Sequence, residues 1–465
     1  MSTLGIDAYQ LTTLLAHADE GRLHQELNMA FFFRKLPKAR NYVVFAGLRR
    51  LLDGTLRFTP DEIDTLLRHE LIGPALKARP QVLAALRALD GFEGEIDALP
   101  EGTLAFAGPG RRTDGSVLMV NGLPVSLYTP MIEVRTSLLT AKLIETPWLG
   151  AINYLSMVAS KAARVVEAAA GKAVYEFGGR RTHPDAAVDA AYAAYLAGAA
   201  GTSNLLAQHR YGVPARGTMD HFYVQAAERD GTPRPDTERQ AFGAFAHAFP
   251  SASTMLVDTY DTEDGIRQAV AATDGKLSGI RLDSNVNPES VQAARALLKE
   301  LGAPHAQILV SDGLDEYKVQ ALAPYVDSFG VGENITCSPD SPVGIGAVAK
   351  VVVNGYGRIT MKIARGSGKA TLPGRIQAWR FSDHDLIALQ EEAPPTGGQP
   401  LLKPIWRGKS LLAPLPSLEN SRAATGRQIA SLSPSLRGLD VSTTPRPLVA
   451  SDRLVARIEE LSQLS

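Results

Sequence analysis

The chain has 465 residues, of which 45% are hydrophobic and 21% are charged, and its formal net charge is −1. This composition is typical of a folded globular protein long enough for two domains, and the near-zero charge argues against general binding to nucleic acid or to an anionic membrane surface. The single cysteine, Cys337, excludes an internal disulfide and a cysteine-rich metal cluster, as expected in a reducing compartment.

The beginning of the chain, MSTLGIDAYQ, lacks a basic stretch followed by an apolar one, so no secretory signal is expected. The absence of any run of about 18 apolar residues predicts that no segment spans a membrane. We therefore expect a cytoplasmic protein with no membrane partner and no nucleic-acid partner.

The first part of the chain predicts a mixed α/β domain. Thr59, Pro60 and Glu62 form a strong helix start, with threonine as the N-cap and proline at the first helical position. In chain order, the predicted elements are a helix over 4–20, strands over 28–34 and 42–45, helices over 60–70 and 80–89, and a strand-rich part over 102–130.

The middle of the chain predicts long helices and then βα units. The spacing of apolar residues indicates helices over 137–170 and 185–200, and Pro147 is expected to interrupt or kink the first. From 254 to 332, apolar runs alternate with helical segments, a pattern that predicts a parallel sheet. The expected strands are 254–258, 279–283, 308–312 and 326–331, and the expected helices are 263–272, 288–301 and 315–323.

Polar or glycine residues follow each of these four strands. The carboxyl ends of parallel strands form the active face both of a barrel and of an open α/β sheet, so a site is expected there with either closure. The last part of the chain predicts strands within 345–381, an extended linker over 393–427, and a strand followed by a helix over 451–463.

Three polar turns separated by helix-like sequence also indicate a site. They are Glu176–Arg181, Gly201–Asn204 and Gly217–His221. Glycine lets the backbone approach a ligand, arginine binds phosphate or carboxylate through two parallel hydrogen bonds, and histidine can act as a base or a nucleophile.

Short motifs occur in a fixed order along the whole chain. They are DAYQLT (7–12), FRKLP (33–37), FAGL (45–48), EFGGRR (176–181), GTSN (201–204), GTMDH (217–221), VDTYDT (257–262), GIRLDS (279–284), DGLDE (312–316), FGVG (329–332) and KATLPG (369–374). Because these motifs occur together and in this order, the chain resembles the nicotinate phosphoribosyltransferase family.

The resemblance implies an α/β fold in which an irregular (β/α) barrel is joined to an α/β domain completed by both chain ends. We expect residues 1–135 to form the N-terminal α/β domain and 136–350 the barrel. Residues 351–465 are expected to pack back on the N-terminal domain. The resemblance also implies a homodimer with active sites shared across its interface.

The implied reaction joins nicotinate to 5-phosphoribosyl 1-diphosphate, giving nicotinate mononucleotide and pyrophosphate in NAD biosynthesis. The resemblance further implies Mg²⁺ as a cofactor and ATP as a co-substrate, hydrolysed through a phosphorylated histidine. His221 matches that histidine, and neutral imidazole is a fair nucleophile toward phosphorus. Phe222 stands where the family often has an acid, so Asp220 is expected to orient the ring instead.

Further residues match the family's binding positions for the pyridine ring. Phe177 and Tyr9 match the aromatic residues that enclose the ring, with Tyr9 coming from the partner subunit. Arg281 matches the arginine that meets the ring substituent, where a fixed guanidinium can pair with a carboxylate. At the position of Ser203 the related nicotinamide enzymes have an aspartate, which would repel the carboxylate of nicotinate, so the serine favours the acid.

A second set of residues matches positions that face phosphate, ribose and magnesium. Arg180 corresponds to a phosphate-facing arginine, and Gly332 lies in a loop expected to cradle phosphate. Asp258 and Asp283 are expected to face the ribose and Mg²⁺, because magnesium prefers carboxylate oxygen. The other expected phosphate contacts are Asp312 and Gly313 at the 5′-phosphate, with Arg34, Lys369 and Arg375 as additional cations.

Two departures from the family pattern leave alternatives open. Asn285 and Val286 replace the Gly-Asp of the family's Asp-Ser-Gly-Asp, and Glu333 places an acid in the loop expected to cradle phosphate. The alternatives are a phosphoribosyltransferase for another pyridine acid such as quinolinate, and a non-catalytic relative that binds nucleotide.

Overall fold

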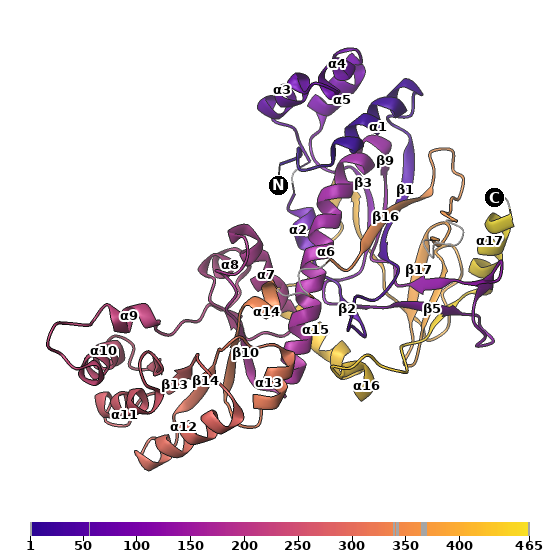
Figure 1. Ribbon diagram of the computed structural model, residues 1–465. Helices are drawn as coiled ribbons and strands as arrows, with labels where there is room; N and C mark the ends of the chain where they lie inside the picture. The colour runs from indigo at the N-terminus through magenta and orange to yellow at the C-terminus, as the bar shows by residue number, and fades with distance from the viewer. Residues whose placement is uncertain (1, 55, 338–339, 341–343, 364–369, 464–465) are drawn as a thin grey trace. The chain divides into compact units, whose positions relative to one another are not determined.

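The computed structural model describes residues 2–54, 56–337, 340, 344–363 and 370–463. The chain forms two compact units (Figure 1). Unit 1 consists of Met1–Met157 and Val343–Ser465, and unit 2 consists of Val158–Pro342. The sequence placed the domain boundaries near 135 and 350, whereas the two units divide near 157 and 343, because helix α6 (Leu138–Ala168) begins in unit 1 and ends in unit 2.

The main sheet of unit 1 joins strands from both ends of the chain. β16 (Ala347–Val353) pairs with β1 (Glu26–Phe33), and β20 (Lys403–Gly408) pairs with β3 (Gly94–Ala98). The strand order is β16-β1-β9-β3-β20-β21, in which β9 is Ile132–Ser137 and β21 is Ser410–Leu411, and every pair is antiparallel.

A second sheet of unit 1 mixes the chain ends in the same way. Its order is β19-β17-β18-β22-β5-β8, with β19 (Gln399–Pro400), β17 (Ile376–Arg380), β18 (Asp385–Leu389), β22 (Leu448–Ala450), β5 (Ala107–Arg111) and β8 (Ser126–Tyr128). Two further strand pairs are β2 (Val43–Val44) with β4 (Leu104–Ala105), and β6 (Met119–Val120) with β7 (Leu123–Pro124).

The helices of unit 1 are α1 (Ala8–Asp19), α2 (Leu48–Leu52), α3 (Pro60–Arg68), α4 (Ile72–Lys77), α5 (Pro80–Ala88), α15 (Leu418–Ala430), α16 (Pro434–Arg437) and α17 (Asp452–Gln463). The predicted start of α3 is confirmed, since Thr59 and Glu62 form a reciprocal capping box. The extended linker predicted over 393–427 is wrong, because this stretch contains β19, β20, β21 and the beginning of α15. β20 forms a local hairpin with β21 and also pairs with β3 from the other end of the chain, a partner that no local pattern reveals.

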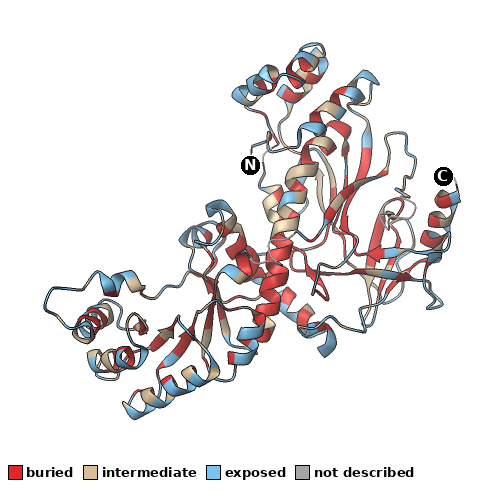
Figure 2. Cartoon of the chain, in the orientation of Figure 1, coloured by how far each residue is buried: buried red, intermediate tan, exposed pale blue. Residues whose placement is uncertain are grey.

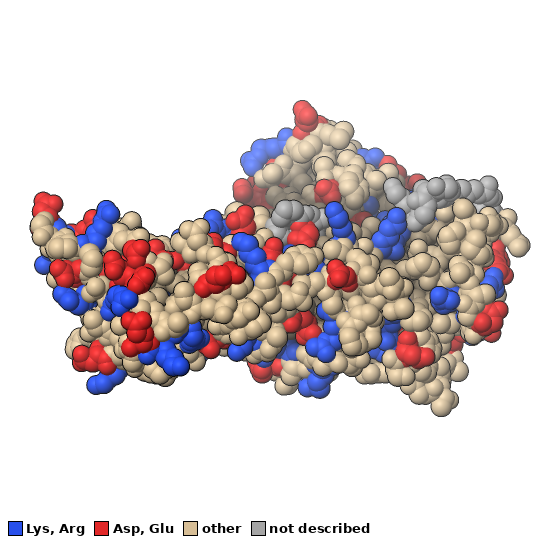
Figure 3. Space-filling view, turned by 60° about the horizontal axis from the view of Figure 1, so that its bottom comes forward, with Lys and Arg blue, Asp and Glu red and all other residues tan. Residues whose placement is uncertain are grey.

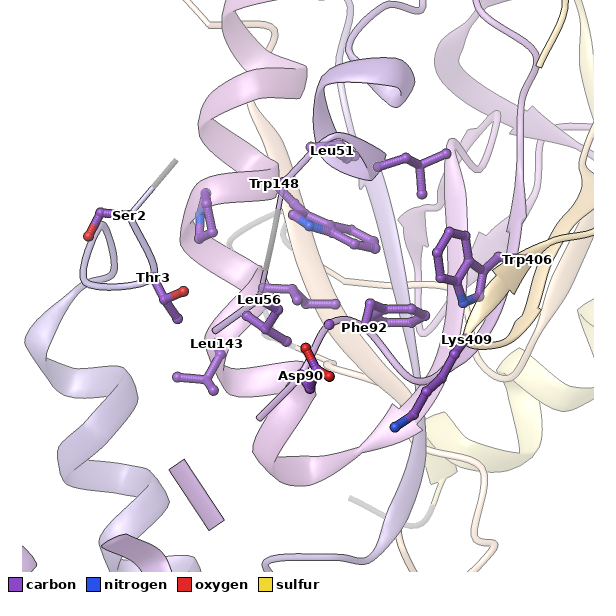
Figure 4. A pocket seen from close by; sticks show the side chains of 15 residues that line it. Ser2, Thr3, Leu51, Leu56, Asp90, Phe92, Leu143, Trp148, Trp406 and Lys409 are labelled. Atoms are coloured by element: carbon purple, nitrogen blue, oxygen red, sulfur yellow. The ribbon is translucent and has the colours of Figure 1, made fainter. Parts of the chain in front are cut away.

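Bulky aromatic side chains fill unit 1. Phe31, Phe32 and Phe33 are all buried, so both faces of β1 are covered, and Phe32 stacks on Tyr128 with 4.1 Å between ring centroids. Unit 1 also contains a cavity of about 230 Å³, and Figure 4 shows Trp148 and Trp406 among the side chains that line it.

Helix α6 is continuous over 31 residues with Pro147 inside it, so the predicted interruption did not occur. Proline removes one backbone donor from a helix, but the neighbouring Leu143, Ile144 and Trp148 are buried and fix this part of the helix by packing. In Figure 2 the later part of α6 is largely red, which marks it as buried.

The sheet of unit 2 is parallel throughout, and its order is β11-β10-β15-β14-β13-β12. The strands are β10 (Ala173–Glu176), β11 (Gly201–Thr202), β12 (Thr254–Leu256), β13 (Gly279–Leu282), β14 (Gln307–Val310) and β15 (Ser328–Val331). The predicted βα alternation is confirmed. Among the described residues no pairing joins β11 to β12, so the barrel expected here is open between these two strands.

The helices that follow these strands are α7 (Pro184–Leu196), α8 (Leu205–Tyr211), α9 (His221–Gln225), α10 (Arg234–Ala248), α11 (Thr262–Ala272), α12 (Pro288–Glu300), α13 (Glu316–Leu322) and, after the last strand, α14 (Glu333–Thr336). Lys161 and Arg164 of α6 both bond the buried carboxylate of Glu316, at 2.6 and 2.9 Å, and so fasten α13 to α6. The attraction of both cations helps to hold the pKa of Glu316 below its usual range, against the effect of burial.

The surface charge is mixed on the face that Figure 3 shows. Lys, Arg, Asp and Glu side chains are intermixed over the face shown in Figure 3, without a stripe of one sign. Among the described residues, no helix is long and apolar enough to cross a membrane.

Glu133 of β9 is a buried carboxyl group inside unit 1. Its Oε1 accepts a long hydrogen bond of 3.4 Å from the Ile376 amide, and its Oε2 has no hydrogen-bond partner among the described residues. Burial raises the pKa of Glu133 to about 8, although the nearby Arg375 guanidinium lowers it. The folded protein therefore holds the proton of Glu133 at pH values where the unfolded chain releases it.

We predict that Glu133→Gln removes a pH dependence of stability. Because the folded pKa is about 8 and the ordinary value is 4.5, the wild type loses stability as the pH rises from about 5 to 8, by up to about 1.4 kcal/mol per pH unit. Glutamine resembles the protonated acid, so the variant gains stability relative to the wild type over this range. Thermal unfolding midpoints at pH 5 and pH 8 measure the difference, with the exposed Glu70→Gln as control. Equal pH profiles for Glu133→Gln and the wild type would contradict this account.

Candidate active site

The predicted site residues of unit 2 gather at one edge of its sheet. Phe177 follows β10, Ser203 follows β11, Asp258 follows β12, and Arg281 and Asp283 lie at the end of β13. Asp312 and Gly313 follow β14, and Gly332 follows β15. Since all six strands are parallel, these positions share the carboxyl-terminal edge, as the sequence predicted.

His221, the first residue of α9, faces two carboxylates. Its Nε2 lies 3.7 Å from Asp283 Oδ2 and 4.0 Å from Asp258 Oδ1, and its Nδ1 lies 3.2 Å from Thr259 Oγ1. The expectation that Asp220 orients the ring is wrong, because the Asp220 carboxylate accepts from the Tyr223 amide at 2.9 Å and caps α9. Thr259 takes that place, and the only sequence signal for it was the VDTYDT motif.

The carboxylate of Asp258 is almost fully enclosed, with 2% of its side chain exposed. Its Oδ2 accepts a hydrogen bond of 2.6 Å from the Asp283 amide, while its Oδ1 accepts no hydrogen bond from any described residue. Burial raises the pKa of Asp258, and the amide of Asp283 and the neighbouring His221 act in the opposite direction. A buried carboxylate oxygen with no donor is a position where a ligand hydroxyl or a cation would be stabilised.

Arg281, Ser311 and Asp283 form a closed hydrogen-bond network. Arg281 Nε donates to Ser311 Oγ at 2.7 Å, and its Nη2 donates to Asp283 Oδ1 at 3.1 Å. The Ser311 hydroxyl in turn donates to Asp283 Oδ1 at 2.6 Å. This network fixes the guanidinium, whose Cζ lies 5.7 Å from the centre of the Phe177 ring. Ser311 was missed in the sequence because a serine at a strand end carries no signal of its own.

The Phe177 ring lies directly against Gly330 of β15. A Cβ atom at Gly330 would come within 2.3 Å of the ring, so only glycine leaves room for the ring in this position. A Cβ atom at Gly332 would lie 3.1 Å from the Phe177 carbonyl oxygen. Gly330 therefore leaves room for the aromatic ring, and Gly332 allows the close approach of the Phe177 backbone.

The buried Glu176 carboxylate ties two of the polar turns together. It accepts hydrogen bonds from the Gly178 amide and, at 2.6 Å, from the Thr202 hydroxyl. Burial raises the pKa of Glu176, and these two donors lower it. The Ser203 amide also donates to the Glu176 carbonyl at 3.0 Å, and the side chains of Ser203 and Arg180 are exposed.

The turn after β13 accommodates the first departure from the family pattern. Asn285 has φ of 52°, the left-handed conformation that asparagine adopts more readily than most non-glycine residues. The Asp312 carboxylate accepts from the Val286 amide at 3.0 Å and so holds this turn. Gly313 also has a positive φ, of 47°. The turn after β13 therefore has a left-handed residue at the position where the family's motif has glycine, and asparagine tolerates that conformation.

The second departure, Glu333, is the first residue of α14 and is exposed. An acid in the first turn of a helix is favoured by the helix dipole. Asn334 next to it donates to the Leu314 carbonyl at 2.9 Å and connects the turns after β14 and β15.

Three of the predicted residues lie in unit 1, whereas the site described above consists of unit 2 residues alone. Tyr9 is 52% exposed, with Lys142 Nζ 5.4 Å from the centre of its ring. Arg34 donates to the Ala370 carbonyl at 3.4 Å, and Arg375 forms an ion pair of 2.9 Å with Asp97. Lys369 lies outside the described residues.

Comparisons with known proteins agree with the motifs. A family model described as the nicotinate phosphoribosyltransferase (NAPRTase) N-terminal domain matches residues 4–111, and one described as the quinolinate phosphoribosyl transferase C-terminal domain matches residues 158–340. The chain is 36% identical to nicotinate phosphoribosyltransferase pncB2 of Mycobacterium tuberculosis, over 99% of this chain and 94% of that protein. Its identity to human nicotinate phosphoribosyltransferase is 31%, over 98% of this chain and 96% of the human protein.

Solved structures agree with the fold. The crystal structure of human nicotinic acid phosphoribosyltransferase matches with a TM-score of 0.78 and 28% identity, covering 98% of this chain and 99% of that chain. Nicotinate-nucleotide pyrophosphorylase from Pyrococcus furiosus matches with a TM-score of 0.69 and 24% identity, covering 92% and 96%, which supports the fold alone. The predicted α/β fold class is confirmed, and the chain belongs to the nicotinate phosphoribosyltransferase family.

Proposed function

We propose that this enzyme transfers the phosphoribosyl group of 5-phosphoribosyl 1-diphosphate to nicotinate, giving nicotinate mononucleotide and pyrophosphate for NAD biosynthesis. The observation that carries the proposal is the Phe177 ring beside the fixed Arg281 guanidinium, with Cζ 5.7 Å from the ring centre. Phe177 supplies a flat apolar surface for a pyridine ring, and Arg281 supplies a cation for the ring carboxylate.

In the proposed reaction the pyridine nitrogen forms a bond to C1 of the ribose as the bond from C1 to the pyrophosphate oxygen breaks. Positive charge develops on the sugar in such a displacement, and the carboxylates of Asp258 and Asp283 stabilise it. Their geometry requires no reorganisation, because the Asp283 amide already holds Asp258 and Arg281 already holds Asp283.

Ser203 supports nicotinate over nicotinamide as the substrate. Its exposed side chain follows β11, and its amide is fixed by the Glu176 carbonyl. A hydroxyl group at this position is neutral toward the carboxylate of nicotinate, whereas an aspartate would repel it.

Magnesium is proposed as the cofactor, bound together with the diphosphate substrate. No group of three or more His, Cys, Asp or Glu side chains within the described ranges could hold a metal ion. Asp258, whose Oδ1 accepts no hydrogen bond from any described residue, and the nearby Asp283 would hold a magnesium ion, because magnesium prefers carboxylate oxygen. When bound, Mg²⁺ neutralises the charge of the departing pyrophosphate.

ATP is proposed as a co-substrate that phosphorylates His221. Thr259 holds Nδ1, so Nε2 remains as the nucleophile. Attack of Nε2 on the γ-phosphorus forms a P–N bond and breaks the P–O bond to ADP, and later hydrolysis releases phosphate.

The proposal includes a cytoplasmic homodimer with shared active sites. Tyr9 would then come from the partner subunit and meet the pyridine ring, while Arg34 and Arg375 are additional candidates for phosphate contacts. The 52% exposure of Tyr9 supports this assignment, since an exposed aromatic side chain is available to a partner.

Quinolinate is the second candidate substrate, favoured by the match of residues 158–340 to a quinolinate phosphoribosyl transferase domain. A second ring carboxylate requires a second cation near the ring. Within the described part of unit 2, Arg281 is the cation found over the Phe177 ring, which favours nicotinate.

Pyrophosphate release by the purified protein tests the substrate assignment. We expect turnover with nicotinate that ATP increases, and at least about 100-fold lower kcat/KM with nicotinamide and with quinolinate. Nicotinamide has no carboxylate to pair with Arg281, and the second carboxylate of quinolinate finds no second cation near the ring among the residues that the structure describes. The three ring compounds are assayed in parallel, each with and without ATP. Preferred turnover of quinolinate would transfer the assignment to the second candidate, and no turnover of any ring acid would contradict the proposal.

Replacing His221 tests the coupling to ATP. His221→Ala should abolish the stimulation by ATP and the transfer of label from γ-³²P ATP to the protein, while ATP-independent turnover stays within about threefold of the wild type, since Phe177 and Arg281 are unchanged. The control is His305→Ala, an exposed histidine in the same unit. Label retained on the His221→Ala protein would show that another residue is phosphorylated.

Enlarging Gly330 tests the position of the ring. Gly330→Ala places a methyl group 2.3 Å from Phe177, so the ring must move, and we expect kcat/KM for nicotinate to fall by about tenfold or more, mainly through KM. Gly243→Ala, with only one contact at 3.9 Å in α10, is the matched control. Unchanged kinetics in Gly330→Ala would exclude Phe177 as the ring-binding surface.

A further inference from the structure

A large cleft in unit 1 has no role in the proposed reaction. Its volume is about 730 Å³, within the range of small-molecule sites. It lies between the end of β17, the strands β19 and β20, and α15. The charged side chains that line it are Glu101, Arg380, Lys403, Arg427 and Arg446.

Two of these arginines form the fixed wall of the cleft. Arg380 and Arg446 both bond the fully buried carboxylate of Asp385, at 2.8 and 2.9 Å. Both guanidinium groups also lie over the Phe106 ring, 5.3 and 5.6 Å from its centre. Since one carboxylate is shared by two cations, this wall keeps an excess positive charge.

The other two cations are not engaged. Neither Lys403 of β20 nor Arg427 of α15 forms an ion pair or side-chain hydrogen bond with any described residue. Glu101 is the one acid in the described lining, and its Oε1 is occupied by the Gly47 amide at 2.8 Å. Two available cations and a positively charged wall therefore line the same cavity.

We propose that this cleft binds a small organic phosphate, with Lys403 and Arg427 as the phosphate contacts. Lysine and arginine are the usual donors to phosphate oxygens. The cavity exceeds what inorganic phosphate fills, so the ligand carries an organic part of up to mononucleotide size. The site belongs to unit 1 alone and does not rest on the proposed transfer reaction.

Calorimetric titration with AMP tests the site, using the full-length protein. We expect the double variant Lys403→Ala/Arg427→Ala to bind AMP at least tenfold more weakly than the wild type, or to lose one binding equivalent per chain. The exchanged variant Lys403→Arg/Arg427→Lys should keep AMP binding within about threefold, because it retains both charges. Turnover of nicotinate without added nucleotide should change less than twofold in either variant.

The matched control is Lys409→Ala/Arg422→Ala, which also removes one lysine and one arginine. Lys409 follows β20 and Arg422 lies in α15, and neither side chain lines the cleft. The control variant should bind AMP like the wild type. AMP that binds elsewhere, including at the site in unit 2, is not affected by Lys403→Ala/Arg427→Ala. If this variant binds AMP as tightly and in the same amount as the wild type, the proposal is overturned. Equal losses in the test and control variants, which would indicate a general charge effect, also overturn it.

Titrations with adenosine and with inorganic phosphate separate the parts of the ligand. Adenosine should bind at least tenfold more weakly than AMP, because it lacks the phosphate. Inorganic phosphate should bind more weakly than AMP and lose its binding in the same double variant. Inorganic phosphate that binds as tightly as AMP would overturn the assignment of an organic ligand, and thermal unfolding of each variant verifies that it is folded.

Discussion

The hydrogen bond from the Asp283 amide to the Asp258 carboxylate is the constraint on which the candidate active site depends. It joins the ends of β12 and β13 at 2.6 Å, and Ser311 extends the connection to β14 through Asp283. The ends of these three strands are thereby held in fixed positions relative to one another before any ligand binds. A site fixed in this way stabilises charge in the transition state without reorganising, which is where enzymes gain most of their electrostatic effect.

The two departures from the family's motifs lie in turns that hydrogen bonds and helix structure accommodate in this chain. Asn285 adopts the left-handed conformation at a position where the family has glycine, and the Asp312 carboxylate holds the Val286 amide that follows. Glu333 is exposed in the first turn of a helix, where an acid is favoured. Both replacements therefore fit the local structure in which they occur.

Unit 1 depends on a different kind of interaction, the pairing of strands from opposite ends of the chain. β3 pairs with β20 and β5 with β22, so neither chain end forms a complete sheet alone. The Asp385 carboxylate of β18 is buried between Arg380 and Arg446. Because it neutralises only one of these two cations, the cleft they line is positively charged. Closing such long loops is entropically unfavourable, and the buried aromatic residues of β1 and β8 offset it.

The sequence by itself determined the α/β class, the βα alternation over 254–332, the capped start of α3 and the order of the glycine-containing turns, because these follow from local periodicity and turn chemistry. It did not predict the contacts of Thr259, Ser311 or Gly330, although two of these residues lie in the motifs VDTYDT and FGVG, and it assigned Asp220 to His221 when Asp220 caps a helix. It also took 393–427 for a linker. The capping role of Asp220 is a local contact with Tyr223. Only the tertiary structure decided the other points, since they depend on which residues from distant strands become neighbours, and the local sequence does not specify those neighbours.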